Sequence, residues 1–230
     1  MLFNLLQAVD TTAMTSGAAA SQEMHFSLIE MAVKGGWLMI VLLILSIMAI
    51  YIFGNKWWMI RKAGKIDKNF MKDIHDLIHD GKIKSAIALC QKYDSPIARL
   101  VEKGIERIGR PLPDIQAAVE NMGNVEVARL EKGLPMLATI SGGAPMIGFL
   151  GTVSGMIQAF FRMSTAGNNI DITLLSGGIY EAMVTTVGGL FVGIIAYFGY
   201  NYLTSQISNL VFKMESTTIE FIDMLHEPAL

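Results

Sequence analysis

The sequence has few charged residues and a single cysteine. Only 17% of its 230 residues are Asp, Glu, Lys or Arg, whereas 52% are hydrophobic, and these proportions favour a membrane protein over a soluble one. With Cys90 alone, no intrachain disulfide can form, and its place in the segment AIALCQKY predicts a buried structural residue. The net charge of −2 gives no reason to expect nucleic-acid binding.

Motifs for chemistry are also missing from the sequence. It contains no nucleotide-binding loop, nucleophile triad or other catalytic motif, so we expect neither an enzyme nor a bound cofactor. His75 and His79 have a spacing that can hold a metal, but no third firm ligand is in register with them. A solvated helix face is therefore the better interpretation of this pair.

Charge is almost absent from two long stretches. Gly133–Phe161 has 29 residues without a charged side chain, and Ile172–Phe212 has only Glu181. About 20 apolar residues are enough to cross a bilayer. With the bulky apolar run 37–53, these stretches predict an all-α integral membrane protein with three transmembrane helices and a cytoplasmic helical domain.

The distribution of basic residues predicts the orientation of the chain. Of the 18 Lys and Arg residues, 15 lie in 56–132, which the positive-inside rule assigns to the cytoplasm. Residues 1–24 lack the basic segment of a signal peptide, so a cleaved leader is not expected. The predicted organisation is an extracytoplasmic N-terminus with an interfacial amphipathic helix (1–35), transmembrane helix 1 (36–55), a cytoplasmic helical domain (56–132), transmembrane helix 2 (133–163), a short periplasmic connector (164–173), transmembrane helix 3 (174–205) and a cytoplasmic helical tail (206–230).

Two helix boundaries can be read within the predicted cytoplasmic domain. Ser95 followed by Pro96 is typical of a helix start, with Ser as the N-cap and Pro at the first helical position. A later helix is expected to run from about Asp114 directly into the second span, as a stalk. The apolar period of the tail, which includes Ile207, Met214 and Ile219, predicts that the third span continues as one helix packed against this domain.

Small and weakly polar residues form a stripe on each of the last two predicted spans. The two sets are Ser141, Pro145, Gly148, Thr152 and Gly155, and Gly178, Ala182, Thr186, Gly189, Gly193 and Ala196. Gly151 with Gly155, and Gly189 with Gly193, have the GxxxG spacing of close helix packing. The stripes predict close backbone contact or a narrow lining, and we expect other copies of the chain to cover them. Pro145 is expected to kink its helix.

Glu181 is the sharpest single signal in the sequence. An acid inside a membrane helix is costly, so it usually faces a cavity or a partner, and we interpret Glu181 as part of an ion path. The alternative is a solvated position near the outer interface, because Asp171 is only ten positions away. Whether Glu181 faces a pore or a seam between subunits stays open. Thr152, Thr185 and Thr186 either line the path or serve as hydrogen-bonding contacts between helices.

The segment APMIGFLGTVSGM, followed about 30 residues later by GIYEAMVTTVGGL, resembles the paired membrane signature of the ExbB/TolQ/MotA family, and most closely its ExbB and TolQ branch. In this resemblance Thr152 and Thr186 occupy the two pore threonines, and Glu181 occupies the family's acid. The resemblance implies a homopentamer in the bacterial inner membrane around single-span partners of the ExbD/TolR type. Each such partner carries a membrane aspartate that takes and releases the ion.

The resemblance further implies a motor subunit driven by the proton motive force, which energises TonB-dependent outer-membrane transport together with a TonB-type protein. A TolQ-like role with a TolA-type protein in the Tol-Pal envelope system is the nearest alternative. A passive ion channel acting alone and a membrane scaffold are two others. We expect the transported ion to be H⁺, although the hydroxyl oxygens of the threonines would also suit Na⁺.

Overall fold

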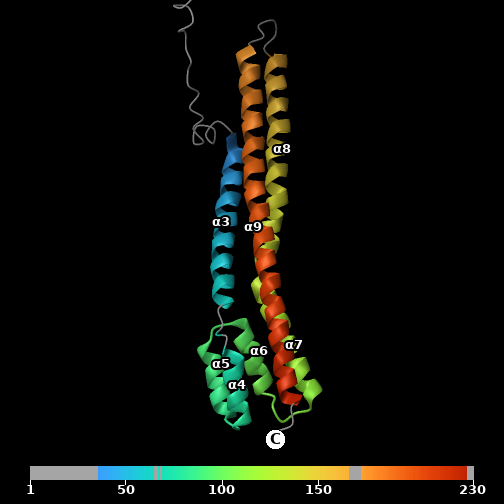
Figure 1. Cartoon of the computed structure of the whole chain (residues 1–230). Helices are drawn as coiled ribbons and strands as arrows, with labels where there is room; N and C mark the ends of the chain where they lie inside the picture. Colours follow the sequence, from blue (N-terminus) through green and yellow to red (C-terminus); the bar gives the residue numbers. More distant parts are fainter. Residues whose placement is uncertain (1–35, 65–66, 68, 166–171, 227–230) are drawn as a thin grey trace, which may run out of the picture.

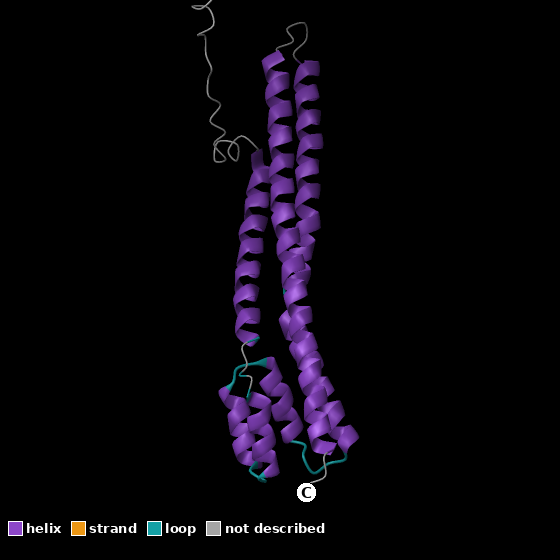
Figure 2. Cartoon of the chain, in the orientation of Figure 1, coloured by secondary structure: helices purple, strands orange, loops and turns teal. Residues whose placement is uncertain are grey.

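The computed structural model describes residues 36–64, 67, 69–165 and 172–226, and all regular secondary structure in these ranges is helical (Figure 2). In chain order the helices are α3 (Gly36–Ala63), α4 (Phe70–His79), α5 (Ile83–Lys92), α6 (Pro96–Ile105), α7 (Leu112–Glu131), α8 (Leu134–Thr165) and α9 (Ile172–His226) (Figure 1). The amphipathic helix predicted within 1–35 and most of the predicted connector lie outside the described residues.

Three stretches are long and apolar enough to cross a membrane. They are α3, the stretch Leu112–Thr165 that holds α7 and α8, and the stretch Leu175–His226 of α9. This confirms the predicted all-α fold with three candidate spans. The helices α8 and α9 lie side by side along their length, and α3 packs beside them (Figure 1). With 55 residues, α9 is about 80 Å long and continues far beyond a hydrocarbon layer of about 30 Å.

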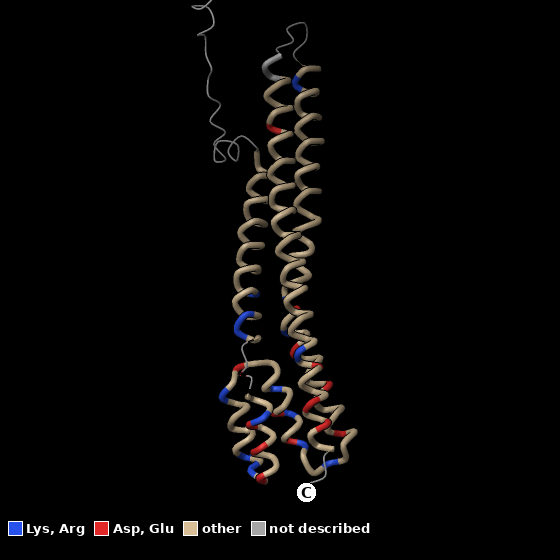
Figure 3. Tube along the Cα trace, viewed as in Figure 1, with Lys and Arg blue, Asp and Glu red and all other residues tan. Residues whose placement is uncertain are grey.

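Charge divides the molecule into two halves. Lys, Arg, Asp and Glu gather around α4 to α7 and the last turns of α9, whereas the upper part of α3, α8 and α9 is almost free of them (Figure 3). We call these parts the charged half and the uncharged half. In the uncharged half the outward-facing side chains are large and apolar, as expected for contact with lipid; they include Ile44, Ile47, Phe149, Phe160, Phe191 and Ile194.

A small apolar core holds the charged half together. Phe70, Ile74, Ile105 and Phe221 are almost completely buried there, so α4, α6 and the end of α9 share one core. Cys90 lies in the same core, and burial raises the pKa of its thiol to about 12. The thiol is therefore protonated at neutral pH, which agrees with the structural role predicted for it.

The start of α6 follows the prediction, whereas the start of α8 does not. Ser95 caps α6, because the amide of Ala98 donates to its hydroxyl oxygen at 3.3 Å and Pro96 opens the helix. The expected continuous stalk into the second span is wrong: α7 ends at Glu131 and α8 begins at Leu134. Gly133 adopts a left-handed backbone with φ of 96° at the break. Pro135 cannot donate a backbone hydrogen bond, so it belongs in the first turn of a new helix.

A chain of ion pairs links α3 to α7 across the charged half. The guanidinium of Arg99 binds the carboxylate of Glu126 with two hydrogen bonds, 2.9 and 2.7 Å long, and Glu126 is almost completely buried. Arg99 also contacts Asp94 at 3.0 Å, and Asp94 pairs with Lys62 at 2.8 Å. The bond to Glu126, more than any other effect, raises the pKa of Arg99. The periodicity of the sequence carried no sign of this network.

The end of α9 differs in one detail from the predicted apolar face. Ile207 and Met214 are buried as expected, but Ile219 is 62% exposed and Phe221 is buried in its place. Elsewhere in the charged half, His75 and His79 are exposed and their rings stack at 6.3 Å between centroids.

Candidate ion path

The seam between α8 and α9 consists of backbone pressed against backbone. A Cβ atom built on Gly189 would lie 2.6 Å from the carbonyl oxygen of Ala144 and 2.9 Å from the Cα of Gly148. A Cβ atom on Gly151 would lie 2.8 Å from the Cβ of Thr185. Only glycine fits at these positions, because real Cβ atoms do not approach other atoms so closely.

The two ends of this seam are built in the same way. Towards the tip of the helix pair, a Cβ atom on Gly155 would lie 2.8 Å from that of Ala182. Towards the charged half, a Cβ atom on Gly193 would lie 2.6 Å from the ring of Pro145, and α8 continues past this proline. The two stripes therefore cover each other within one chain. The expectation that other copies are needed to cover them is wrong, because a single sequence shows which face is narrow but not which helix meets it.

Each of the three predicted threonines donates its hydroxyl hydrogen to a backbone carbonyl. Thr185 is buried and donates to its own helix, at 2.8 Å from the carbonyl oxygen of Glu181. Thr152 likewise donates within α8, to Phe149 at 2.6 Å. Thr186 instead crosses the seam and donates to the carbonyl of Gly148 at 2.9 Å. In each case the hydroxyl oxygen keeps lone pairs that can accept a proton or contact a cation.

Glu181 lies where the first turn of α3 meets α9. Its Oε1 atom would be 2.6 Å from a Cβ atom built on Gly36, and Gly36 has a φ of 67°. The left-handed backbone favours glycine at position 36, and a side chain there would also displace the carboxylate of Glu181. The Glu181 side chain is exposed and lines a small pocket that also contains Thr185. The structure thus brings Glu181 and Thr185 together, while Thr152 and Thr186 lie outside this pocket.

Three further polar residues line the same pocket, and the sequence analysis did not assign them a role. Ser154, Gln158 and Arg162 follow one another at four-residue intervals, so they stack along one face of α8. The amide nitrogen of Gln158 lies 3.5 Å from the hydroxyl of Ser154. The cavity of about 40 Å³ has room for water among these groups. Their regular spacing was the signal that could have identified them.

The contacts of α3 with α8 and α9 show how far apart along the helices the polar groups lie. Gly36 is level with Glu181, and Lys56 touches the start of α8 near Gly133. These two residues are 20 positions apart, which is about 30 Å along a helix and matches the thickness of the hydrocarbon layer. Glu181 is therefore level with the start of α3, and Thr186 is about 7.5 Å further along α9 towards the charged half.

In the described part of the seam, the pocket at Glu181 does not continue past Thr185 towards the charged half. Beyond Thr186 the seam is closed by Pro145 against Gly193, followed by the buried apolar residues Ile140, Leu137 and Ala196. Within the part of α8 and α9 that the structure describes, the polar pocket thus ends at Thr185.

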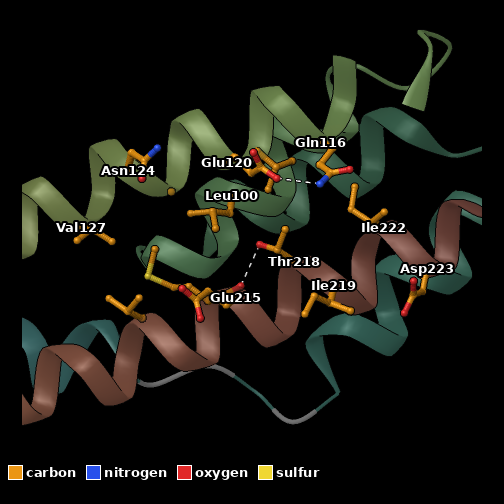
Figure 4. A pocket seen from close by; sticks show the side chains of 14 residues that line it. Leu100, Gln116, Glu120, Asn124, Val127, Glu215, Thr218, Ile219, Ile222 and Asp223 are labelled. Atoms are coloured by element: carbon orange, nitrogen blue, oxygen red, sulfur yellow. Dashed lines mark hydrogen bonds between the residues drawn. The ribbon is translucent and has the colours of Figure 1, made fainter. Parts of the chain in front are cut away.

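A much larger cavity is far from these groups. It is a groove of about 600 Å³ between α7 and α9 in the charged half, with Leu100 of α6 at its base (Figure 4). Glu120, Glu215 and Asp223 are among its lining residues (Figure 4). The groove shares no residue with the pocket at Glu181 and contains none of the residues predicted from the sequence to carry an ion.

Comparison with known proteins shows which family this chain belongs to. Residues 92–216 match the MotA/TolQ/ExbB proton channel family. The chain is 27% identical over 190 residues to a putative biopolymer transport protein ExbB homolog of Methanothermobacter thermautotrophicus, covering 82% of this chain and 67% of the relative. It is 29% identical over 208 residues to a putative ExbB-like protein of Synechocystis sp., covering 87% and 82%. It is also 35% identical over 106 residues to the Tol-Pal system protein TolQ of Haemophilus influenzae, covering 46% of each chain.

Proposed function

Because this chain belongs to the MotA/TolQ/ExbB proton channel family, we propose that it is an ExbB-like motor subunit of the inner membrane, driven by the proton motive force. In this proposal it energises TonB-dependent outer-membrane transport. The observation that carries the proposal is the polar pocket that opens beside Glu181 and ends at Thr185, with Thr186 in the seam one residue further along α9. An ion that enters there needs a second carrier to reach the other side.

A mobile acid on a partner would supply that second carrier. We propose an ExbD/TolR-type single-span protein whose membrane aspartate takes the ion at the level of Thr152 and Thr186. A carboxylate neutralised by a proton crosses apolar surroundings at low cost, which favours H⁺. Na⁺ would need additional oxygen ligands, and the threonine hydroxyls could provide some of them. One charge that falls through 100 mV releases about 2.3 kcal/mol, which is enough to drive a step of the partner.

We further propose that several copies of the chain, five in the family resemblance, surround the partner. The support is the exposed apolar surface of α8 and α9, which includes Met146, Phe149, Leu190 and Phe191 and has to meet lipid, partner or other copies. The TolQ-like role in the Tol-Pal system stays the alternative, because relatives with both names match the chain. Transport of a biopolymer is named only for the relatives.

The proposed orientation has the charged half and the C-terminus in the cytoplasm, and the N-terminus and the connector outside. A cysteine label at Lys82 should then be reached only from the cytoplasm, and one at Asn168 only from outside. The endogenous Cys90 is buried and protonated, so it gives little background. Labelling with the opposite sidedness would contradict both the orientation and the motor function.

The decisive experiment measures proton flux into proteoliposomes that contain the chain with and without its single-span partner. We expect flux only with the partner, and a strong decrease in the double variant Thr152→Val/Thr186→Val. Val153→Thr, on the same helix, is the matched control and should retain flux. Flux without the partner would indicate a passive channel, and full motor activity in the double variant would indicate a scaffold.

The choice between ions is tested in the same vesicles with separate gradients. Activity that follows the proton gradient in sodium-free buffer supports H⁺. Activity that needs sodium and persists with a protonophore would show that Na⁺ is the transported ion.

A further inference from the structure

Basic residues from two distant parts of the sequence meet where the uncharged half ends. Lys56 and Arg61 lie on the last turns of α3, and Lys132 directly follows α7. The Nζ atom of Lys56 donates to the carbonyl oxygen of Arg129 at 3.1 Å, which places this ammonium at the C-terminal turn of α7. A Cβ atom on Gly133 would be 3.8 Å from the Cε of Lys56, so the α7–α8 turn rests against the same side chain.

Three of these cations have no acidic partner among the described residues. Lys62 pairs with Asp94, and Arg129 lies 3.5 Å from Glu126, which Arg99 already binds. The ion pairs found within the described ranges include none for Lys56, Arg61 or Lys132. A local excess of positive charge therefore remains, and it attracts an anion from outside the chain.

The surroundings show what kind of anion fits. Lys56 is about 30 Å along α3 from the level of Glu181, which places it at the other edge of the hydrocarbon layer. Trp57 and Trp58 follow it and are 39% and 68% exposed, as is typical of side chains at headgroup depth. The guanidinium carbon of Arg61 lies 4.8 Å from the centroid of the Trp57 ring. A soluble anion would leave the exposed indole rings without contacts, whereas a lipid would cover them.

We propose that Lys56 and Lys132 bind the headgroup of an anionic phospholipid at this edge of the membrane. The phosphate lies between the two ammonium groups, and Trp57 and Trp58 contact the glycerol and the first acyl carbons. A zwitterionic lipid fits less well, because its own ammonium would meet two lysines that form no ion pair within the described residues. The bound lipid joins α3 to the α7–α8 turn, where the protein itself provides one hydrogen bond from Lys56.

The test uses the full chain in nanodiscs of phosphatidylcholine alone, or of phosphatidylcholine mixed equally with phosphatidylglycerol. Native mass spectrometry measures the retained lipid, and thermal unfolding measures the effect on the fold. We expect the wild type to retain phosphatidylglycerol selectively and to unfold at a higher temperature in the mixture. In Lys56→Gln/Lys132→Gln the retention should fall about twenty-five-fold, because each basic residue contributes about a fivefold gain at an anionic surface.

Two further variants separate lipid binding from folding and from diffuse charge. Lys56→Arg/Lys132→Arg should keep the selective retention of phosphatidylglycerol. Lys132→Gln alone, which leaves the hydrogen bond from Lys56 to Arg129 in place, should lose part of that retention. The control Lys72→Gln/Lys84→Gln removes the same charge from exposed positions on α4 and α5 and should behave like the wild type. Equal loss in this control would overturn the proposal, and so would equal retention of both lipids by the wild type.

Inorganic phosphate, added to the nanodiscs of phosphatidylcholine alone, distinguishes the source of the anion. We expect it to leave the unfolding temperature unchanged. Stabilisation by phosphate equal to that by phosphatidylglycerol would assign the site to a soluble anion and contradict the lipid.

Discussion

The long helix α9 packs by opposite means in the two halves of the molecule. In the uncharged half, α8 and α9 touch through glycine backbones, with Gly148 against Gly189. In the charged half, α9 packs through large buried side chains such as Leu210 and Phe221 against the helices of that domain. Lipid tails are as apolar as leucine, so burial of leucine between helices gains little there, and close contact is what remains. The solvent outside a helix thus determines how it packs.

The largest effect is expected from Glu126→Ala in the charged half. Removal of this carboxylate breaks two hydrogen bonds between charged groups and leaves Arg99 with Asp94 alone, which costs about 3 kcal/mol of unfolding free energy. Chemical unfolding followed by circular dichroism measures it. Glu120→Ala, on the same helix but exposed, is the control. Equal unfolding curves for the two variants would show that the buried pair does not hold α6 to α7.

Gly189→Leu tests the seam of the uncharged half. Its side chain would enter the space of Ala144 and Gly148, so we expect a loss of about 1–3 kcal/mol or more and little folded protein in detergent. Gly177→Leu on the same helix, where a Cβ atom meets nothing within 4 Å, should fold normally. Size-exclusion chromatography with a fluorescent fusion separates the outcomes. A well-folded Gly189→Leu would mean that the backbones of α8 and α9 are not in contact at Gly189.

A smaller effect is expected from Thr186→Val. The variant keeps the shape of the side chain but loses the hydrogen bond to Gly148, and such bonds in membrane helices contribute about 0.6 kcal/mol. Thermal unfolding should thus change little while proton flux falls. If stability falls strongly and flux per folded molecule is unchanged, the residue is a packing contact only.

The smallest effect belongs to Asp94→Asn at the surface of the charged half. Hydrogen bonds from Lys62 and then Arg99 hold the pKa of Asp94 below its ordinary value. Since the folded pKa is the lower one, the contribution is present at neutral pH and is lost as the pH falls below about 4. Unfolding at neutral pH should differ from wild type only in low salt, because salt screens exposed pairs. A difference that persists in molar salt would contradict a surface role.

The sequence by itself determined the three spans and several local features. Uncharged runs predict membrane helices, because a charge inside the layer costs free energy wherever the helix lies. The start of α6 at Ser95 and Pro96 was also predictable, since both residues act on the backbone next to them. Glu181 was identified as unusual from its neighbours in the chain alone, and its role in ion movement stays a prediction.

Only the tertiary structure decided which groups meet. It paired Glu181 with Gly36 and Thr186 with Gly148, and it joined Ser154, Gln158 and Arg162 into one pocket with Glu181. It also showed that the two small-residue stripes cover each other. Helical periodicity reports the direction in which a side chain points, but it carries no information about the element on the other side. That element is selected by the packing of the whole chain, in which residues far apart in sequence compete for the same surface.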